Sequence, residues 1–228
     1  IEQRRLLGEF EPALQNDEFV MYLQPQVKRD GAAKGAEALV RWVHPSRGIL
    51  TPYAFIDILE NAGLIYKLDL YIWEKAAQKL AEWKEKGYGS YHISVNISTK
   101  DFYIIDIYET FTGLINKYGI AASNLHLEIT ETTLMTDFEK NMNIIHKLQG
   151  VGFRVEIDDF GSGYSSLNML KDISADVLKI DMGFLRKSEN EVKGQDILES
   201  IITLAGKIGM DVITEGVETK KQLDMLTM

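Results

Sequence analysis

The chain has 228 residues, of which 45% are hydrophobic and 26% charged, a composition typical of one globular domain with a substantial core. It contains no cysteine, which excludes disulfides and thiolate metal sites and favours a reducing compartment such as the cytoplasm. The formal net charge of −9 argues against a binding surface for DNA or anionic membranes. No apolar run is long enough to span a bilayer, although the protein could still be the cytoplasmic part of a membrane-anchored one.

The N-terminal part predicts a helix followed by a hairpin. Apolar and charged side chains at mixed helical spacing predict an entry helix over residues 1–18, and residues 19–228 are then predicted to form a single domain. Alternation predicts strands at Phe19–Val27 and Gly35–Val43. The segment between them is too short for a crossover helix, so they should pair antiparallel. The start of the chain resembles neither a signal peptide nor a translation start, so we expect a piece of a longer protein.

Strands and helices then alternate along the rest of the chain. The predicted strands are His92–Ile97, Leu125–Thr130, Phe153–Asp158, Asp176–Asp181 and Asp211–Glu215. The predicted helices are Tyr53–Ala62, Ile65–Lys86, Phe102–Tyr118, Phe138–Leu148, Ser165–Leu170, Asp196–Ile208 and Thr219–Met228. This order predicts an α/β fold, a (β/α)8-type TIM barrel with an antiparallel first strand and a site at the carboxyl ends of the strands. The closing C-terminal strand is absent from this sequence, so we expect it to lie beyond it.

One stretch places two adjacent carboxylates at the end of a strand. Asp158 and Asp159 follow a β-branched run and precede Gly161-Ser162-Gly163. Side chains alternate along a strand, so the two can face the same way only if the strand ends between them. Paired carboxylates there suit Mg²⁺ or Mn²⁺, which prefer oxygen ligands. A solvated turn capped by an aspartate is the alternative.

Polar side chains also share one face of each predicted strand, while the opposite faces are apolar and should pack on helices. The polar faces carry Glu37, Leu39 and Arg41; His92, Ser94 and Asn96; His126, Glu128 and Thr130; Arg154, Glu156 and Asp158; Lys179 and Asp181; and Glu215 ends the last strand. Burying several carboxylates together is costly unless cations compensate them. The pattern therefore favours a divalent metal, assisted by Lys179 and Arg41.

The ligands would be Glu37, Asn96, Glu128 and Asp158, with Asp159 or Glu215 available for a second ion or for water. An oxygen-only set that includes an amide favours Mg²⁺ or Mn²⁺ over Zn²⁺. Hydrolysis of a phosphate ester is the chemistry that suits such a site. Lys179 could orient or deprotonate the attacking water, or it could be a structural counter-ion.

The ordered motifs resemble the EAL domain, the cyclic di-GMP phosphodiesterase module of bacterial signalling proteins. They are Tyr22-Leu23-Gln24-Pro25, Glu37-Ala38-Leu39, Val95-Asn96-Ile97-Ser98, Glu128-Ile129-Thr130-Glu131, Asp158-Asp159-Phe160-Gly161-Ser162-Gly163, Leu178-Lys179-Ile180-Asp181 and Glu215-Gly216-Val217-Glu218. Seven motifs in the family's order are specific, whereas any one alone would be weak.

The resemblance implies roles for individual residues. Glu37, Asn96, Glu128 and Asp158 would bind Mg²⁺ or Mn²⁺, with Asp159 near a second ion. Lys179 would activate or position water, Glu215 would have a metal-linked role, and Glu131 would anchor the loop from Asp159 to Ser166. Gln24, Leu39 and Arg41 would hold the guanine or phosphate parts of the ligand. The implied reaction opens cyclic di-GMP to linear pGpG, in a homodimer fused to sensory or GGDEF-type domains.

Two departures from the family and two rival functions accompany this interpretation. The family's closing strand, with its Gln-Gly-Tyr-like motif, is absent, and Glu156 stands where the family more often has a small or apolar residue. We expect Glu156 to pair with His126 or Arg154. The rival functions are a receptor or protein-interaction module of the same fold, and a metal-dependent lyase or aldolase. Separately, Lys179 could be a Schiff-base lysine, as in an aldolase.

Overall fold

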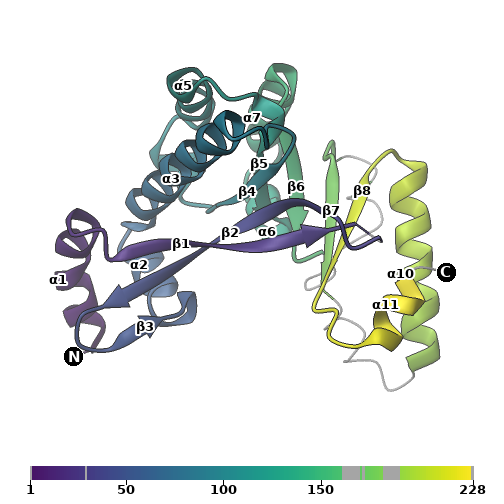
Figure 1. The fold of residues 1–228 in the computed structure, drawn as a ribbon, viewed down its shortest axis with the longest axis horizontal. Helices are drawn as coiled ribbons and strands as arrows, with labels where there is room; N and C mark the ends of the chain where they lie inside the picture. The colour runs from purple at the N-terminus through teal and green to yellow at the C-terminus, as the bar shows by residue number, and fades with distance from the viewer. Residues whose placement is uncertain (1, 29, 161–169, 171–172, 182–190, 227–228) are drawn as a thin grey trace. The chain divides into compact units, whose positions relative to one another are not determined.

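A computed structural model describes residues 2–28, 30–160, 170, 173–181 and 191–226 (Figure 1). The chain falls into two compact units, residues 1–127 with 151–153 and residues 128–150 with 154–228. The first holds α1 Glu2–Gln15, β1 Phe19–Val27, β2 Ala33–His44, β3 Gly48–Leu50, η1 Pro52–Ala54, α2 Ile56–Asn61, α3 Ile65–Glu85, β4 His92–Ile97, α4 Asp101–Ile104, α5 Ile107–Tyr118 and η2 Ala122–Asn124. After β5 Leu125–Thr130, which crosses the boundary, come α6 Glu131–Thr136, α7 Phe138–Val151, β6 Arg154–Asp158, β7 Val177–Asp181, α10 Glu191–Lys207, β8 Asp211–Glu215 and α11 Lys220–Leu226.

The predicted hairpin is confirmed. β1 and β2 pair antiparallel from Phe19 opposite Trp42 to Val27 opposite Ala33, and β4 joins the other edge of β2 in parallel (Figure 1). On β2, Ala36, Ala38 and Trp42 are buried, while Glu37, Leu39 and Arg41 are only half-buried. The alternation of the sequence thus separates a core-facing side of the strand from a polar side.

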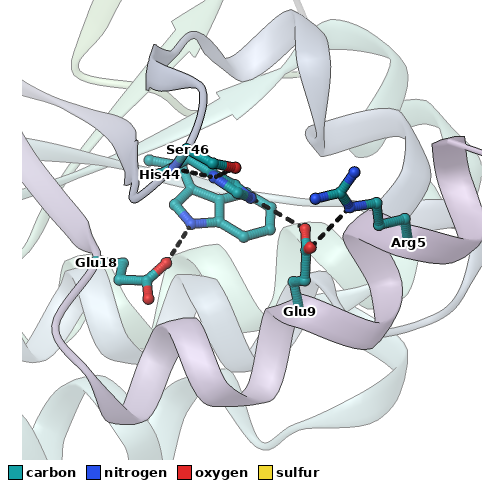
Figure 2. Close-up of polar contacts among 6 residues, drawn as sticks. Arg5, Glu9, Glu18, His44 and Ser46 are labelled. Carbon is teal, nitrogen blue, oxygen red and sulfur yellow. Dashed lines mark hydrogen bonds and ion pairs between the residues drawn. The ribbon is translucent and has the colours of Figure 1, made fainter.

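Hydrogen bonds attach α1 to the end of β2 (Figure 2). The backbone N–H of Ser46 donates to His44 Nδ1 at 3.2 Å, so Nε2 carries the ring proton and donates to Glu9 Oε2 at 3.0 Å. Trp42 Nε1 donates to Glu18 Oε2 at 3.0 Å. In this network His44 is the last residue of β2. It connects the entry helix to the strand that carries Glu37.

The core of the first unit forms around α3. Of the apolar side chains that recur at helical spacing along α3, Leu68, Ile72, Trp73, Ala76 and Leu80 are buried, while Trp83 is half-buried. Trp73 packs against Phe111 of α5, with ring centroids 4.5 Å apart, and donates from Nε1 to the backbone oxygen of Asn96 at 2.9 Å. The end of β4, where Asn96 lies, is therefore held by the core.

In the second unit, β7 pairs in parallel with β6 and with β8. The apolar residues of β6 and β7 are buried, including Val155, Ile157, Leu178 and Ile180, whereas those of β8 are half-buried. Helix α10 packs beside β8 (Figure 1). Parallel strands put their carboxyl ends at one edge, so Asp158, Asp181 and Glu215 end neighbouring strands.

Short elements differ from the predictions. The three-residue strand β3 was not predicted, and α6 was missed although Thr130 caps it by accepting a hydrogen bond from the N–H of Thr133. The helix predicted over 102–118 is two helices, because the side chain of Asp106 accepts from the N–H of Glu109 and begins α5 anew. The predicted helix Ser165–Leu170 lies outside the described residues except for Leu170. None of the described helices combines the length and hydropathy that a bilayer span requires.

Candidate functional site

A buried lysine contacts carboxylates from three other strands of the second unit. Lys179 lies on β7 with 1% of its side chain exposed, and its Nζ donates to Glu128 of β5 and to Glu215 Oε1 of β8, the latter at 2.7 Å. Asp158 Oδ1 at the end of β6 lies 3.4 Å from the same nitrogen. One ammonium facing three carboxylates leaves excess negative charge at these strand ends.

Glu128 has an unsatisfied oxygen. The residue is fully buried, and its Oε2 has no hydrogen-bond partner among the described residues. A buried carboxylate oxygen without a donor is costly unless a cation lies beside it. The donor set of Glu128, Asp158 and Glu215 therefore fits a hard divalent cation, whose preferred ligands are oxygens.

Asp159 occupies a backbone conformation that few residues adopt. Strand β6 ends at Asp158, and Asp159 has a φ of 55°, in the left-handed region where aspartate is one of the tolerated residues. The strand ends between the two carboxylates, as their spacing predicted. Burial, followed by the charges of Glu215 and Asp181, raises the pKa of Asp159 above its ordinary value.

The first unit carries a second polar cluster on β1, β2 and β4. Gln24 is opposite Glu37 in the hairpin register, and Asn96 Nδ2 lies 3.5 Å from Glu37 Oε1, a long hydrogen bond. Asn96 is exposed and Glu37 half-buried. Arg41, on the same face, donates from Nη1 to the backbone oxygen of Val40 at 2.8 Å. The predicted ligands Glu37 and Asn96 thus lie together within this unit.

Deeper on this face, His92 is enclosed between a glycine and a second imidazole. Its ring stacks on His126 with centroids 3.8 Å apart and an interplanar angle of 1°. Its Nε2 lies 2.7 Å from Gln26 Oε1, and a Cβ built on Gly35 would come within 2.5 Å of the ring. Gly35 is therefore required by close packing, a role that the sequence analysis did not assign to it.

Replacing Gly35 by alanine should lower the free energy of unfolding by about 2 kcal/mol, because the added methyl group displaces His92 from its stack. Gly113 on α5 is a matched control, since an added Cβ there meets nothing within 4 Å. Gly113→Ala should instead stabilise by roughly 0.5–1 kcal/mol, the usual gain for alanine in a helix interior. Urea unfolding of both variants measures the two changes, and equal effects would contradict this account.

A pair of acidic side chains joins α3 to α4. Asp101 is fully buried, and its Oδ2 accepts from the N–H of Ser98 at 2.8 Å. Its Oδ1 has no ordinary donor among the described residues, and Asp69 is the group beside it. Burial, then the charges of Asp101 and Glu60, raise the pKa of Asp69 well above its ordinary value. The two carboxyl groups therefore interact where α3 meets α4.

This pair predicts a pH dependence of stability. Because the pKa of Asp69 is higher in the folded state, the native protein binds this proton more tightly than the unfolded chain. The resulting stabilisation is complete below the unfolded pKa and is lost as the pH rises through the folded pKa. Asp69→Asn, whose amide mimics the protonated acid, should be more stable than the parent at neutral pH, and the difference should shrink towards about pH 4. Unfolding curves across this range test it, and parallel pH profiles would refute it.

The structure tests the predictions for Glu131 and Glu156 only in part. Glu131 is the first residue of α6, but most of the loop it would anchor lies outside the described residues. Glu156 is fully buried. Arg154 is not its partner, because this guanidinium donates to Asp211 Oδ2 at 2.7 Å and to the backbone oxygen of Asp176. The pairing of Glu156 with His126 stays a prediction.

Comparison with known proteins places the chain in a family. The family model described as EAL domain matches residues 8–228. The chain belongs to the EAL domain family. This EAL domain is 34% identical over 227 residues to the bifunctional diguanylate cyclase/cyclic di-GMP phosphodiesterase MucR of Pseudomonas aeruginosa, covering 99% of the chain and 33% of MucR. It is 32% identical over 215 residues to the cyclic di-GMP phosphodiesterase PdeR of Escherichia coli, covering 94% of the chain and 32% of PdeR.

A solved structure of a MucR phosphodiesterase with cyclic di-GMP matches this EAL domain with a TM-score of 0.91 at 33% identity, covering 98% of the chain and 91% of that structure. The predicted fold class, a (β/α)8-type barrel fold with an antiparallel first strand, is confirmed by this match and by the pairing of β1 with β2. The chain spans about a third of the length of the curated relatives named above.

Proposed function

We propose that this EAL domain is a divalent-metal-dependent phosphodiesterase that hydrolyses cyclic di-GMP to linear pGpG in bacterial signalling. The observation that carries the proposal is the cluster of Glu128, Asp158, Lys179 and Glu215, in which Glu128 and Lys179 are buried and Glu128 retains an oxygen without a donor among the described residues. The names of MucR and PdeR and the family membership support the same reaction.

The metal would be Mg²⁺ or Mn²⁺, with one or two ions per site. Its proposed ligands are Glu128, Asp158 and Asp159, and the sequence motifs add Glu37 and Asn96. This assignment rests on the sequence motifs and on the oxygen chemistry of the residues. A bound divalent cation supplies charge neutralisation at phosphate oxygens and a lowered pKa for water.

The residues of the chain would then bind and orient the substrate. Water oxygen forms a new bond to phosphorus, the bond from phosphorus to the ribose 3′ oxygen breaks, and a water proton ends on that oxygen. Lys179 would position this water, and its contact with Glu215 would help to hold Nζ in place. Gln24, Leu39 and Arg41 would hold the guanine and phosphate groups. Glu131 would order the loop that follows Asp159.

The contacts of Lys179 disfavour the aldolase alternative. A Schiff-base lysine must be uncharged to attack a carbonyl, and an apolar or cationic setting promotes this. Lys179 instead faces three carboxylates, those of Glu128, Asp158 and Glu215. The receptor alternative requires a site that binds the ligand but lacks a group needed for hydrolysis, and the chain retains every residue assigned above.

The decisive experiment incubates the protein with cyclic di-GMP and Mg²⁺ or Mn²⁺ and follows pGpG by chromatography. We expect pGpG with either metal and none after addition of EDTA. Binding of cyclic di-GMP without product at saturating metal would assign the domain to the receptors instead.

We also propose that the domain forms a homodimer and belongs to a longer protein with sensory or GGDEF-type domains. MucR, of which the match covers 33%, is named as a diguanylate cyclase as well as a phosphodiesterase. Light scattering of the protein with and without Mg²⁺ tests the dimer.

A further inference from the structure

Tyr22 lies on the polar face of the hairpin, beside residues assigned to the substrate. It is opposite Leu39 in the register of β1 and β2, and it is two residues from Gln24 on the same strand. Residues opposite each other, and residues two apart, share one face of a sheet. Tyr22, Gln24, Leu39 and Arg41 therefore line the same face.

The ring of Tyr22 is exposed and is oriented by a cation. The guanidinium carbon of Arg41 lies 5.6 Å from the ring centroid, within the range of a cation–π interaction. Arg41 is itself fixed by its hydrogen bond to the backbone oxygen of Val40. Even so, 47% of Tyr22 is exposed, although tyrosine normally buries its ring. An aromatic plane held in place with so much surface uncovered can stack on another planar group.

Resting on the proposed function, we propose that Tyr22 is a purine-binding residue: Arg41 lies over one face of its ring, and one guanine of the cyclic dinucleotide stacks on the other face. Every base has an aromatic face, and stacking on a protein ring is worth about 1–3 kcal/mol per base. Gln24, next on this face, offers both a donor and an acceptor to the edge of that base. The sequence motif Tyr22-Leu23-Gln24-Pro25 thus contributes a stacking plane as well as an amide.

The test compares Tyr22→Leu, which removes the ring, with Tyr22→Phe, which keeps it. Tyr53→Leu is the matched control, because Tyr53 is 98% exposed on η1 and lies off the strand face. Tyr22→Leu should raise KM for cyclic di-GMP by about 5- to 150-fold with kcat nearly unchanged, the range that one lost stacking contact gives. Tyr22→Phe and Tyr53→Leu should match the parent.

Two further measurements separate stacking from other roles. Hydrolysis of methyl 4-nitrophenyl phosphate, a diester without a purine, should be the same in Tyr22→Leu and the parent. A loss on this substrate would mean that Tyr22 only positions Arg41, and the proposal would fail. Calorimetric binding of cyclic di-GMP in an Asp158→Asn background gives a readout without turnover, and there too Tyr22→Leu should weaken binding.

The outcomes distinguish this proposal from the proposed function. If the parent binds cyclic di-GMP without hydrolysing it and Tyr22→Leu weakens that binding, hydrolysis is wrong and the stacking role stands. If the parent hydrolyses it and Tyr22→Leu changes neither KM nor affinity, the stacking role is wrong and hydrolysis stands. A parent that does not bind cyclic di-GMP at all overturns both.

Discussion

Replacing Lys179 by methionine should lower the free energy of unfolding by about 3–5 kcal/mol, the cost of leaving a buried charge without its partner. Methionine matches the length of lysine but cannot donate to Glu128, which is fully buried, or to Glu215. Urea unfolding with EDTA present measures the loss. Lys86→Met is a control, because the exposed pair of Lys86 with Glu82 should contribute less than about 1 kcal/mol.

Divalent metal should partly rescue this variant. With the ammonium gone, Glu128, Asp158 and Glu215 lack a compensating charge, so a cation that binds only the folded state should stabilise Lys179→Met more than the parent. Unfolding curves with Mg²⁺ or Mn²⁺ measure the difference. An equal or smaller metal effect in the variant would contradict a metal site at these carboxylates.

Asp158→Asn should reduce hydrolysis of cyclic di-GMP by more than about 100-fold, because even residues that only support a metal ligand change activity by 10- to 100-fold. The substitution keeps the shape of the side chain, and Glu128 and Glu215 still hold Lys179. Asp158 is 18% exposed, so the amide can be hydrated and unfolding should change by less than about 1 kcal/mol. Rates of pGpG formation and urea unfolding test both statements.

Asp30→Asn is the matched control for that variant. Asp30 lies in the exposed turn between β1 and β2, where its Oδ1 accepts from the N–H of Ala32 at 2.9 Å. Asparagine makes the same turn, so this variant removes one carboxylate and should keep full activity. If Asp158→Asn retains activity comparable to Asp30→Asn, Asp158 is not a metal ligand.

The long strands could be predicted from sequence because one side of each is apolar. β1, β4, β5 and β8 begin and end where alternation placed them. The short elements could not be predicted, because the three residues of β3 are too few to show an alternating pattern. The cap of α6 was visible as Thr130 followed by Thr133, yet its threonine-rich sequence favoured a loop.

The site was predictable in part. The shared face of each strand identified which side chains lie on its polar side, but alternation gives no distances, so the three contacts of Lys179 could not be foreseen. Tyr22 had a usable signal, since it is two residues from Gln24, but an aromatic residue in a strand normally indicates core. The contact of Asp69 with Asp101 joins two helices and depends on tertiary packing. The assignment of a single domain and of individual ligands stays a prediction.

The left-handed backbone conformation at Asp159 limits which residues can replace this aspartate without strain. With φ at 55°, glycine and asparagine fit without strain, whereas β-branched side chains would distort the end of β6. A single-nucleotide substitution can change an aspartate codon to a codon for glycine or for asparagine. Inactive descendants of this domain should therefore carry one of those two residues at this position while keeping an intact scaffold.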